Sequence, residues 1–310
     1  MLKTVFIVNP KAGQKKANET FVAEILKTAK ELNIEVEVLK TECVGDGARI
    51  AKECCEKYGS VRLIACGGDG TLNEVVNGAV GFPGAEVGVL PMGTGNDFCR
   101  NFQDQGRFDI AGVLLGTAQK CDLIRFDTEV DGEVKTRYCV NMFNIGFDCE
   151  VADLTGTMKQ KPFISGAFAY FISIFIALVQ KKGANLKLSL DGEEAHNGPL
   201  LLSAISNGCF CGGGIKSNPL GSVQDGVIEI NIIKNVTRTR LLTLLGSYMN
   251  GTFIHKKGIE RFIVTRKCKT IDLEVFSENF RLSVDGEVID GGKTTFTVAP
   301  GALSFVVPKK

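Results

Sequence analysis

Short apolar runs alternate with segments of helical periodicity along the first 126 residues. The runs at 4–9, 34–39 and 61–66 are rich in β-branched side chains, which is typical of strands. Residues 17–32 and 47–58 carry apolar side chains three and four positions apart, which predicts helices. This alternation predicts a doubly wound α/β domain, in which helices cover a parallel sheet. The same rhythm continues with a helix at 71–80, a strand at 87–90 and a helix at 109–118.

From Asp122 onward the chain changes to strand-like runs joined by Asp-Gly turns, a pair that favours tight hairpins. Asp131, Asp191 and Asp285 each begin such a turn. One segment of helical periodicity, 238–249, interrupts the series. We therefore expect a mainly antiparallel second domain. Its strands are predicted at 123–130, 135–142, 186–190, 227–233, 271–276 and 280–284.

Residues 163–179 form an apolar segment of seventeen residues without a charge. That length is at the lower limit for a membrane-spanning helix. Bulky and small side chains fall into separate stripes at helical spacing, with Phe168 and Phe175 in one and Ala169 and Ser173 in the other. This arrangement favours a helix docked on the second domain over a membrane span, and its apolar face could line a lipid groove.

The composition is that of a folded, turn-rich protein of enzyme size, with 44% hydrophobic residues and 36 glycines among 310 residues. Lysine and arginine number 36 against 35 acidic residues, so the net charge of +1 gives no general attraction for nucleic acid. The 11 cysteines are odd in number and no signal peptide precedes the first strand, which favours a reducing cytoplasm. Because only two histidines are present, carboxylates are expected to carry any acid or base chemistry.

The most specific motif is Gly-Gly-Asp-Gly-Thr at 67–71, placed where a buried strand ends and a helix begins. Glycines there let the backbone approach a phosphate, and the free N–H groups at a helix start favour an anion. The motif lacks the Gly-Lys-Ser/Thr of a Walker A loop and the third glycine of a dinucleotide fingerprint. An ordinary tight turn explains two of the glycines but not Asp69, an anion among anion-binding groups. A Mg²⁺ ion or a water between Asp69 and the phosphates explains it best.

Two further loops stand at equivalent places, one at 9–13 after the first strand and one at 88–97 at the fourth. In open parallel sheets, ligands bind at the carboxyl ends of the strands. We therefore expect the three loops to converge on one crevice.

Three motifs follow one another in a specific order: Asn-Pro-x-Ala-Gly from Asn9, Gly-Gly-Asp-Gly-Thr-x-Asn-Glu from Gly67, and Pro-x-Gly-Thr-x-Asn-Asp from Pro91. Together they resemble the diacylglycerol kinase catalytic-domain family, which includes bacterial lipid kinases, sphingosine kinases and ceramide kinases. The resemblance extends over essentially the whole chain. Later landmarks of compact bacterial members are matched at 144–148, 212–214, 218–219, 225–226 and 284–287.

The resemblance implies a nucleotide-binding α/β domain at 1–126, Rossmann-like and similar to NAD kinase and phosphofructokinase, which a returning C-terminal strand at 300–310 joins. It implies a β-sandwich lipid-substrate domain at 127–299, with ATP as co-substrate and Mg²⁺ as cofactor. The residues implied in ATP contact are Asn9, Pro10, Lys11, Ala12, Gly13, Thr41, Gly68, Asp69, Gly70, Thr71, Leu72, Asn73, Glu74 and Thr94.

The resemblance also assigns roles to acidic residues. Glu287 matches the general base, although Asp-Gly-Glu occurs three times and spacing alone does not choose among the copies. A water-linked magnesium network is implied at Asp69, Asp97 and Asp122. A structural magnesium would be held by the Asp225 side chain with the backbone oxygens of Ser222 and Val227.

The implied activity is transfer of the γ-phosphoryl group of ATP to a lipid hydroxyl, of diacylglycerol or a similar lipid, giving a phospholipid such as phosphatidic acid. An NAD kinase-like or phosphofructokinase-like enzyme would also carry a Gly-Gly-Asp-Gly-Thr turn. The 9–13 loop, the Asp-Gly-Glu hairpin and the apolar segment favour a lipid acceptor. A non-catalytic module that senses a nucleotide or a lipid is the other alternative, and the retained acidic residues argue against it.

Basic residues are concentrated between Lys234 and Lys269, nine of them against one acidic residue, Glu260. A solvated surface would explain them, but they could also bind anionic lipid. We expect a cytoplasmic protein, peripheral at the inner face of the membrane, with a lipid substrate and no nucleic acid. Homodimer formation stays open. Four lysines that flank the apolar segment could assist membrane contact: Lys159, Lys161, Lys181 and Lys182.

Overall fold

The computed structural model describes residues 2–12, 19–147, 149–151, 154, 183–277 and 279–309. The chain forms two compact units: unit 1 comprises Met1–Leu123 and Pro300–Lys310, and unit 2 comprises Ile124–Ala299. The apolar segment at 163–179 and the four lysines that flank it lie outside the described residues. Among the helices that are described, none is long and apolar enough to span a membrane.

Unit 1 is built on a parallel sheet with the strand order β4-β3-β1-β2. Strands β1, β3 and β4 are almost completely buried, which explains their unbroken apolar runs. The last strand, β15 (Thr294–Val307), joins the β4 edge in parallel, with Phe305 opposite Val87. The C-terminal strand therefore pairs with the sheet of unit 1. The four strands are β1 (Lys3–Val8), β2 (Val36–Lys40), β3 (Val61–Gly67) and β4 (Ala85–Pro91).

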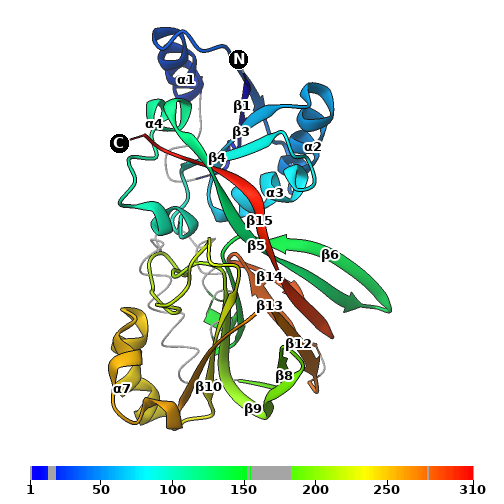
Figure 1. Ribbon diagram of the computed structural model, residues 1–310, viewed down its shortest axis with the longest axis vertical. Helices are drawn as coiled ribbons and strands as arrows, with labels where there is room; N and C mark the ends of the chain where they lie inside the picture. The colour runs from blue at the N-terminus through cyan, green and yellow to red at the C-terminus, as the bar shows by residue number, and fades with distance from the viewer. Residues whose placement is uncertain are drawn as a thin grey trace. The chain divides into compact units, whose positions relative to one another are not determined.

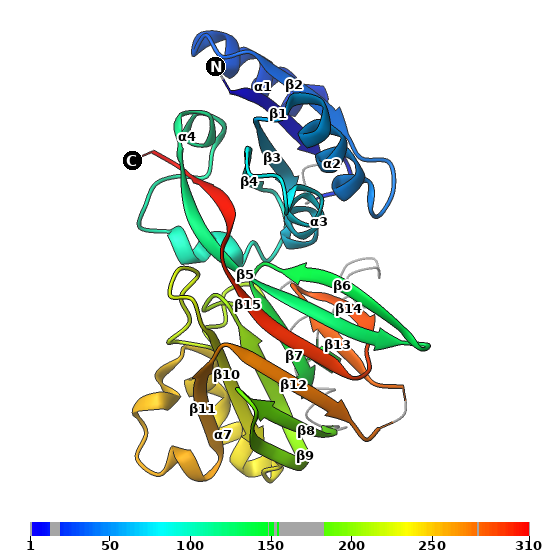
Figure 2. The same cartoon turned by 45° about the vertical axis from the view of Figure 1, so that its right-hand side comes forward.

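Helices cover both faces of this sheet, as Figures 1 and 2 show. The helices α1 (Glu19–Glu31) and α4 (Ile110–Leu115) lie on one face, where Ile25 and Val113 join the same apolar core. The helices α2 (Asp46–Tyr58) and α3 (Asp69–Ala79) pack together on the other face. The prediction of a doubly wound α/β domain is confirmed.

The helix predicted at 109–118 is wrong at its C-terminal end, because α4 stops at Leu115. Gly116 is extended and passes so close to β15 that a Cβ atom on it would lie 2.4 Å from the Val307 carbonyl oxygen. Arg62 Nη1 donates to the carbonyls of Val113 and Leu114, in the last turn of the helix, at 3.2 and 3.0 Å. The chain therefore leaves the helix at Gly116 and enters β5 one residue later.

Unit 2 is an antiparallel sandwich in which one long strand, β9, belongs to both layers. The first half of β9 pairs with β8, and its second half lies between β7 and β10. One layer runs β14-β13-β7-β9-β10-β11 and the other β9-β8-β12-β15-β5-β6. The strands are β5 (Thr117–Val130), β6 (Glu133–Cys139), β7 (Met142–Gly146), β8 (Ala184–Leu190), β9 (Glu193–Ser206), β10 (Ile228–Lys234), β11 (Ile263–Cys268), β12 (Thr270–Val275), β13 (Arg281–Val284) and β14 (Glu287–Asp290).

Aromatic and aliphatic side chains from both layers fill the core of the sandwich. Phe143 of β7 makes edge-on contacts with Phe126 of β5 and Phe296 of β15, at ring-centroid distances of 5.0 and 4.8 Å. These contacts join the two layers. The predicted mainly antiparallel β-sandwich is confirmed.

The strand predicted at 135–142 is wrong, since it is divided into β6 and β7. The backbone N–H groups of Val140, Asn141 and Met142 all donate to the carboxylate of Asp285, at 2.8, 2.8 and 3.0 Å. Three consecutive N–H groups that point at one carboxylate cannot alternate between neighbouring strands. The ladder therefore breaks at this connection.

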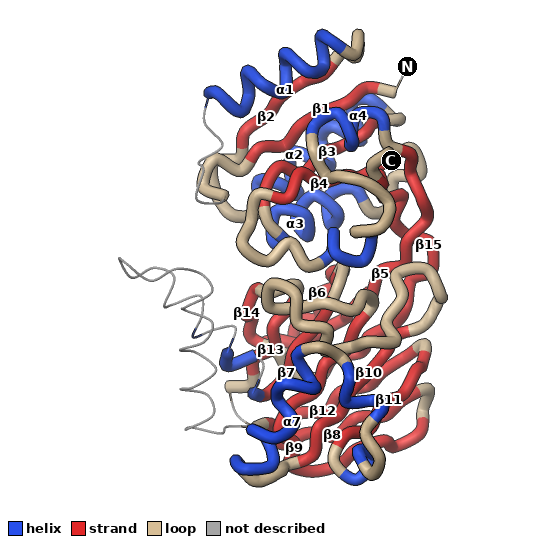
Figure 3. Tube along the Cα trace, turned by 90° about the vertical axis from the view of Figure 1, so that its left-hand side faces the viewer, coloured by secondary structure: helices blue, strands red, loops and turns tan. Residues whose placement is uncertain are grey.

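The helix predicted at 238–249 is confirmed as α7 (Arg238–Met249). Its side chains Leu241 and Tyr248 pack with Leu202 of β9 and Ile233 of β10 in a second apolar cluster. Figure 3 shows α7 lying beside the strands of this layer. The helix therefore covers the outer face of the β7-β9-β10 layer.

Glu229 of β10 is a carboxyl group buried in unit 2, only 1% exposed. Asn231 Nδ2 donates to its Oε1 at 3.3 Å, while its Oε2 has no hydrogen-bond partner in the described part of the chain. Lys267 lies opposite on β11 but pairs with Asp225 at 2.7 Å. Burial raises the pKa of the Glu229 carboxyl from 4.5 to about 7.

Glu229→Gln should raise the free energy of unfolding at about pH 8 and leave it nearly unchanged at about pH 4. Because the folded pKa lies above the unfolded one, the folded protein binds the extra proton between pH 4.5 and about 7, and stability falls as the pH rises through that window. The gain above the window should be on the order of 1–3 kcal/mol. Urea unfolding measures it, with the exposed Glu193→Gln as control. If both substitutions changed the free energy of unfolding equally at high pH, the claim that a buried Glu229 carboxylate destabilises the fold would be contradicted.

Candidate functional site

The loops after β1, β3 and β4 lie side by side at the carboxyl end of the unit 1 sheet. The Asn9 N–H donates to the Cys66 carbonyl at 3.0 Å, and the Met92 N–H donates to the Gly67 carbonyl at 2.8 Å. Asn9 Nδ2 also donates to Thr71 Oγ1 at 3.1 Å, which ties the first loop to the start of α3. The predicted convergence of the three loops is confirmed.

Two glycines allow the second and third loops to touch through their backbones. A Cβ atom on Gly93 would lie 2.6 Å from Gly68 Cα, closer than real Cβ atoms approach. Asn96, with a left-handed φ of 52°, accepts from the Gly93 N–H at 3.0 Å and donates to the Gly93 carbonyl at 2.7 Å. Asparagine tolerates this conformation better than most residues. The third loop is therefore folded so that its glycine backbone faces Gly68.

The start of α3 lacks a capping side chain. Gly68 occupies the cap position and has no side-chain acceptor for the first N–H groups of the helix. The N–H groups of a first helical turn, together with the helix dipole, attract phosphate. The loop thus has the geometry of a phosphate cradle, which the glycines at 67–70 predict.

Two of the predicted acidic residues are brought together at this cradle. Asp69 Oδ1 accepts from the Asp97 N–H at 2.8 Å and from the Phe98 N–H at 3.4 Å. The second oxygens of both carboxylates gather at Gly95, where a Cβ atom would lie 2.8 Å from Asp69 Oδ2 and 3.2 Å from Asp97 Oδ2. Oxygen ligands of this kind suit Mg²⁺. Asp69 and Asp97 therefore fit a magnesium ion, which would lie next to the phosphate cradle.

Asp97 also begins the short 3-10 helix η1 (Phe98–Phe102) and pairs with Arg100 at 3.4 Å. Asp122 is buried on β5, where its Oδ1 accepts from the Gly301 N–H of β15 at 2.8 Å. This bond joins the strand that leaves unit 1 to the strand that returns. Asp122 therefore has a structural role that the resemblance does not mention.

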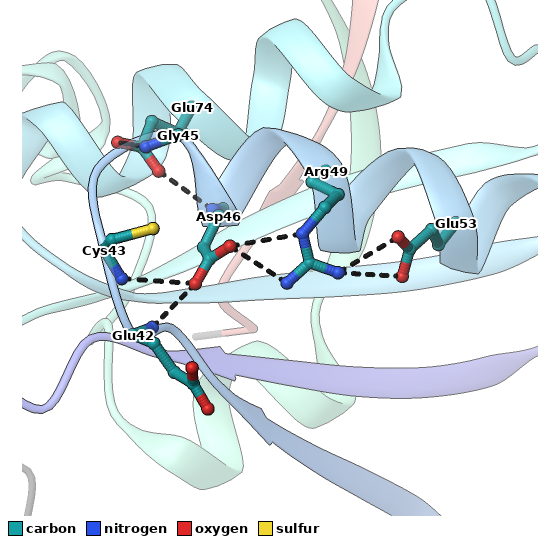
Figure 4. Close-up of polar contacts among 8 residues, drawn as sticks. Glu42, Cys43, Gly45, Asp46, Arg49, Glu53 and Glu74 are labelled. Atoms are coloured by element: carbon teal, nitrogen blue, oxygen red, sulfur yellow. Dashed lines mark hydrogen bonds and ion pairs between the residues drawn. The ribbon is translucent and has the colours of Figure 1, made fainter.

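Several residues predicted to contact ATP are buried in unit 1 or bond to its backbone. The Glu74 carboxylate accepts from the N–H groups of Gly45 and Gly47, both at 2.9 Å (Figure 4). Its bonds hold the loop after β2, at the start of which Thr41 is buried. Leu72 and Asn73 are also buried in α3. Glu74 thus has partners in the protein that the sequence motif alone does not reveal.

Asp46, the first residue of α2, is a second carboxylate that fixes this loop. Its Oδ2 accepts from the N–H groups of Glu42 and Cys43 at 2.8 and 3.2 Å, and its Oδ1 pairs with Arg49 at 2.9 Å (Figure 4). The Glu42 N–H, followed by the Arg49 guanidinium, lowers the pKa of Asp46 to about 2. Glu74 and Asp46 therefore both fix the loop that follows β2.

The other predicted contacts lie on the surface of unit 1. Lys11 and Thr94 are exposed, and Pro10 and Ala12 are half-buried. Lys11 donates its N–H to Asn9 Oδ1 at 2.9 Å, which gives the first loop a tight turn. Gly13 lies outside the described residues.

In unit 2, Glu287 is the first residue of β14 and is exposed beside the turn that Asp285 begins. Asp285 has a left-handed φ of 49°, and its N–H donates to the Met142 carbonyl at 2.9 Å. With the three N–H groups that its carboxylate accepts, this bond fixes the hairpin to the β6–β7 connection. The position of Glu287 therefore depends on Asp285.

The structure distinguishes the three Asp-Gly-Glu copies, which spacing alone does not. Asp191 forms a similar clamp, since its Oδ1 accepts from the N–H groups of Lys269 and Thr270 at 2.9 and 2.8 Å. Asp131 lies at an exposed hairpin tip. Of the three, Asp285 is the copy that clamps the break between β6 and β7.

Two asparagines that no sequence motif identifies add hydrogen bonds to the β6–β7 connection. Asn207 Nδ2 donates to the Val140 carbonyl at 2.9 Å, and Asn141 Nδ2 donates to the Phe210 carbonyl at 2.6 Å. The β6–β7 connection thus holds both the Glu287 hairpin and the loop that follows β9. No local motif marks Asn141 or Asn207, because their partners are backbone groups about 70 residues away, such as Phe210 for Asn141.

Comparison with known proteins matches one family model to each of the two parts of the chain. The diacylglycerol kinase catalytic domain matches residues 3–126, and the YegS C-terminal NAD kinase beta sandwich-like domain matches residues 141–307, more than half of the chain. The chain belongs to the diacylglycerol kinase catalytic-domain family. A Pseudomonas aeruginosa member, named "Probable lipid kinase YegS-like", is 30% identical over 96% of this chain and 92% of its own length. A Staphylococcus aureus member, named diacylglycerol kinase, is 32% identical over 93% of this chain and 86% of its own.

Solved structures share the fold of this family member. A diacylglycerol kinase from Bacillus anthracis str. Sterne has a TM-score of 0.70 at 20% identity, over 98% of this chain and 96% of that one. Yeast NADH kinase, solved with NADH, has a TM-score of 0.53 at 13% identity, over 100% of this chain and 84% of that one. At these identities the likeness shows the fold alone.

The predicted structural magnesium site of this family member lies around Asp225. The Asp225 carboxylate is paired with Lys267 at 2.7 Å, and its Oδ1 accepts from the Val227 N–H at 3.4 Å. Within the described residues, no group of three or more acidic, histidine or cysteine side chains could hold a metal. A cation at Asp225, with Ser222 and Val227 as backbone ligands, would have to displace Lys267. This site stays a prediction.

Asp285→Asn should lower turnover by about 10- to 100-fold although Glu287 is intact, because the amide turns a donor toward backbone N–H groups and shifts the hairpin. It should also cost about 1–3 kcal/mol of stability. Asp191→Asn is the matched control: it disrupts the same kind of clamp elsewhere and should lower stability but not turnover. Urea unfolding measures the stability of both variants, and steady-state kinetics measures their turnover. Equal turnover in the two variants would contradict a positioning role for Asp285.

Proposed function

We propose that this protein is an ATP-dependent lipid kinase that transfers the γ-phosphoryl group of ATP to a lipid hydroxyl. Diacylglycerol or a similar lipid is the proposed acceptor, and a phospholipid such as phosphatidic acid is the product. The observation that carries the proposal is the meeting of the Asp69 and Asp97 carboxylates at Gly95, beside the start of α3, which lacks a capping side chain. A kinase needs these two elements together, since it binds phosphates and the metal that neutralises them.

In this proposal the loops of unit 1 bind and orient the nucleotide. The glycine backbones at 68 and 93, with Asn9 and Thr94, face the phosphates, while Glu74 and Asp46 keep the loop of Thr41 in place. Asp69 and Asp97 would hold Mg²⁺, which when bound neutralises charge on the phosphates. Preorganised N–H groups of the cradle stabilise the charge that develops on the transferred group.

Glu287 is the proposed general base. The acceptor oxygen forms a bond to the γ-phosphorus. The bond between that phosphorus and the oxygen that bridges the β- and γ-phosphates breaks, and ADP leaves. The hydroxyl proton passes to the Glu287 carboxylate. Glu287 suits this role because it is exposed at the end of a hairpin that Asp285 fixes. Acid and base chemistry by a carboxylate is also consistent with a chain that has two histidines.

The two alternatives are weaker. The fold shared with yeast NADH kinase favours a kinase that acts on NAD. At 13% identity, however, that likeness supports no assignment of individual residues. A non-catalytic sensing module would not need two carboxylates meeting at the cradle or a third fixed on a hairpin. Relatives named lipid kinase and diacylglycerol kinase support the lipid acceptor.

Incubation with γ-labelled ATP, Mg²⁺ and mixed micelles of diacylglycerol, phosphatidylglycerol or a sphingoid base tests the proposal. Label should enter a lipid extracted into organic solvent, and parallel reactions with NAD should give no labelled product. Label transfer to NAD and not to any lipid would replace the proposal with the NAD kinase alternative. ATP binding without any transfer would support the sensing module.

Substitutions separate the proposed roles. Glu287→Ala should lower turnover by roughly 10²- to 10⁴-fold, with the Kd for ATP unchanged, because it removes the base and leaves the phosphate cradle. Asp69→Asn should abolish turnover without unfolding the protein, since the amide oxygen can still accept from the Asp97 N–H. Kinetics, calorimetric ATP titration and thermal unfolding measure these effects. Near-normal turnover of either folded variant would remove that residue from the mechanism.

A further inference from the structure

A compact basic segment connects β10 to β11 in unit 2. We define it as residues 234–262 and name it the basic lobe. It comprises α7, the 3-10 helices η2 (Thr252–His255) and η3 (Ile259–Arg261), and the turns between them. Figure 1 draws α7 and the segment after it in gold. Against one acidic residue, Glu260, the lobe carries six basic residues: Lys234, Arg238, Arg240, Lys256, Lys257 and Arg261.

The fold of the lobe separates its apolar and basic side chains. Leu241, Tyr248 and Phe253 are buried in the cluster that covers the β9–β10 face. All six basic side chains are exposed. The lobe is therefore anchored by an apolar inner side, and its cations lie in solvent.

The exposed side of the lobe also carries apolar surface. Leu242 is 54% exposed, and it shares a face of α7 with Arg238, four residues earlier. The Arg240 guanidinium lies 4.2 Å from the ring centroid of Phe262, which is half-buried at the end of the lobe. A leucine exposed beside a cation is typical of surfaces that enter the interfacial region of a bilayer.

Three cations of the lobe form no ion pair with any carboxylate that the structure describes. In the described part of the chain no carboxylate forms an ion pair with Lys256, Lys257 or Arg261. Lys267, which lies outside the lobe on β11, is paired with Asp225 instead. The lobe thus holds six of the nine basic residues between Lys234 and Lys269.

We propose that the basic lobe docks unit 2 on an anionic phospholipid bilayer. The proposal deepens the proposed function and rests on it, because an acceptor lipid lies in a bilayer and the enzyme must reach it there. Cations attract the anionic surface, and Leu242 adds apolar contact once the lobe arrives. Nucleic acid fits less well, because an exposed leucine gains nothing from a phosphate backbone and the net charge of the chain is only +1.

Co-sedimentation without ATP tests docking independently of catalysis. Phosphatidylcholine vesicles, with and without phosphatidylglycerol, are used across a salt series. Binding should require phosphatidylglycerol and weaken as salt rises. The triple variant Lys256→Gln/Lys257→Gln/Arg261→Gln should bind about 100-fold more weakly, at about fivefold per cation.

The matched control removes the same charge at exposed lysines elsewhere: Lys30→Gln/Lys135→Gln/Lys293→Gln. This variant should bind vesicles nearly as the unmodified chain does. Leu242→Ser should weaken the binding that persists at high salt. Equal binding of the two triple variants, or equal binding to neutral and anionic vesicles, would overturn the proposal. Displacement of the protein from vesicles by equimolar RNA would do so too, and would assign the lobe to a nucleic acid.

Kinetics distinguish failure of docking from failure of the proposed function. With a short-chain acceptor dissolved as monomers, the lobe variant should turn over as the unmodified chain does, whereas with acceptor in vesicles its rate should fall. If the unmodified chain transfers phosphate to neither acceptor yet binds anionic vesicles, the proposed function fails and docking stands. If both acceptors are phosphorylated equally well by both triple variants, docking by the lobe is wrong and the kinase stands.

Discussion

The close approach of Gly68 to Gly93 is the constraint on which the candidate phosphate site depends. Each glycine lies at the end of a parallel strand, and a side chain on Gly93 would push the two loops apart. While they touch, the Asp97 N–H reaches Asp69 and both carboxylates meet at Gly95. A parallel sheet brings strand ends together, but only glycine lets their loops close this far.

Carboxylates that accept backbone N–H groups are the recurring means by which this chain fixes its loops. Glu74 and Asp46 hold the loop after β2, Asp69 holds the start of η1, and Asp285 holds the β6–β7 connection. Charge-assisted hydrogen bonds of this kind are stronger than neutral ones. Asp69 therefore combines two tasks, since the side chain proposed to meet a metal also fixes the backbone at Asp97.

The sequence predicts the strands and helices whose pattern is local, and it fails where distant contacts decide. The apolar runs of β1 and β3 and the periodicity of α7 predict these elements, whereas no pattern predicts β9, because burial on both faces removes the alternation from its second half. The break between β6 and β7 depends on Asp285, about 140 residues away. Likewise the glycine motif predicts a phosphate cradle, but the anchoring by Glu74 and the clamp through Asn207 are contacts that no local pattern contains.

Calorimetric titration of MgATP into the unmodified chain and into Gly93→Ala tests most directly whether the Gly68–Gly93 approach builds a nucleotide site. Overpacking two backbones costs about 1–3 kcal/mol, so the affinity of Gly93→Ala should fall about tenfold or more. Gly246→Ala is the control, because a Cβ atom there meets nothing within 4 Å. MgATP binding by the unmodified chain and by Gly246→Ala, with loss in Gly93→Ala, is the predicted result. Equal affinity of all three proteins would contradict the account.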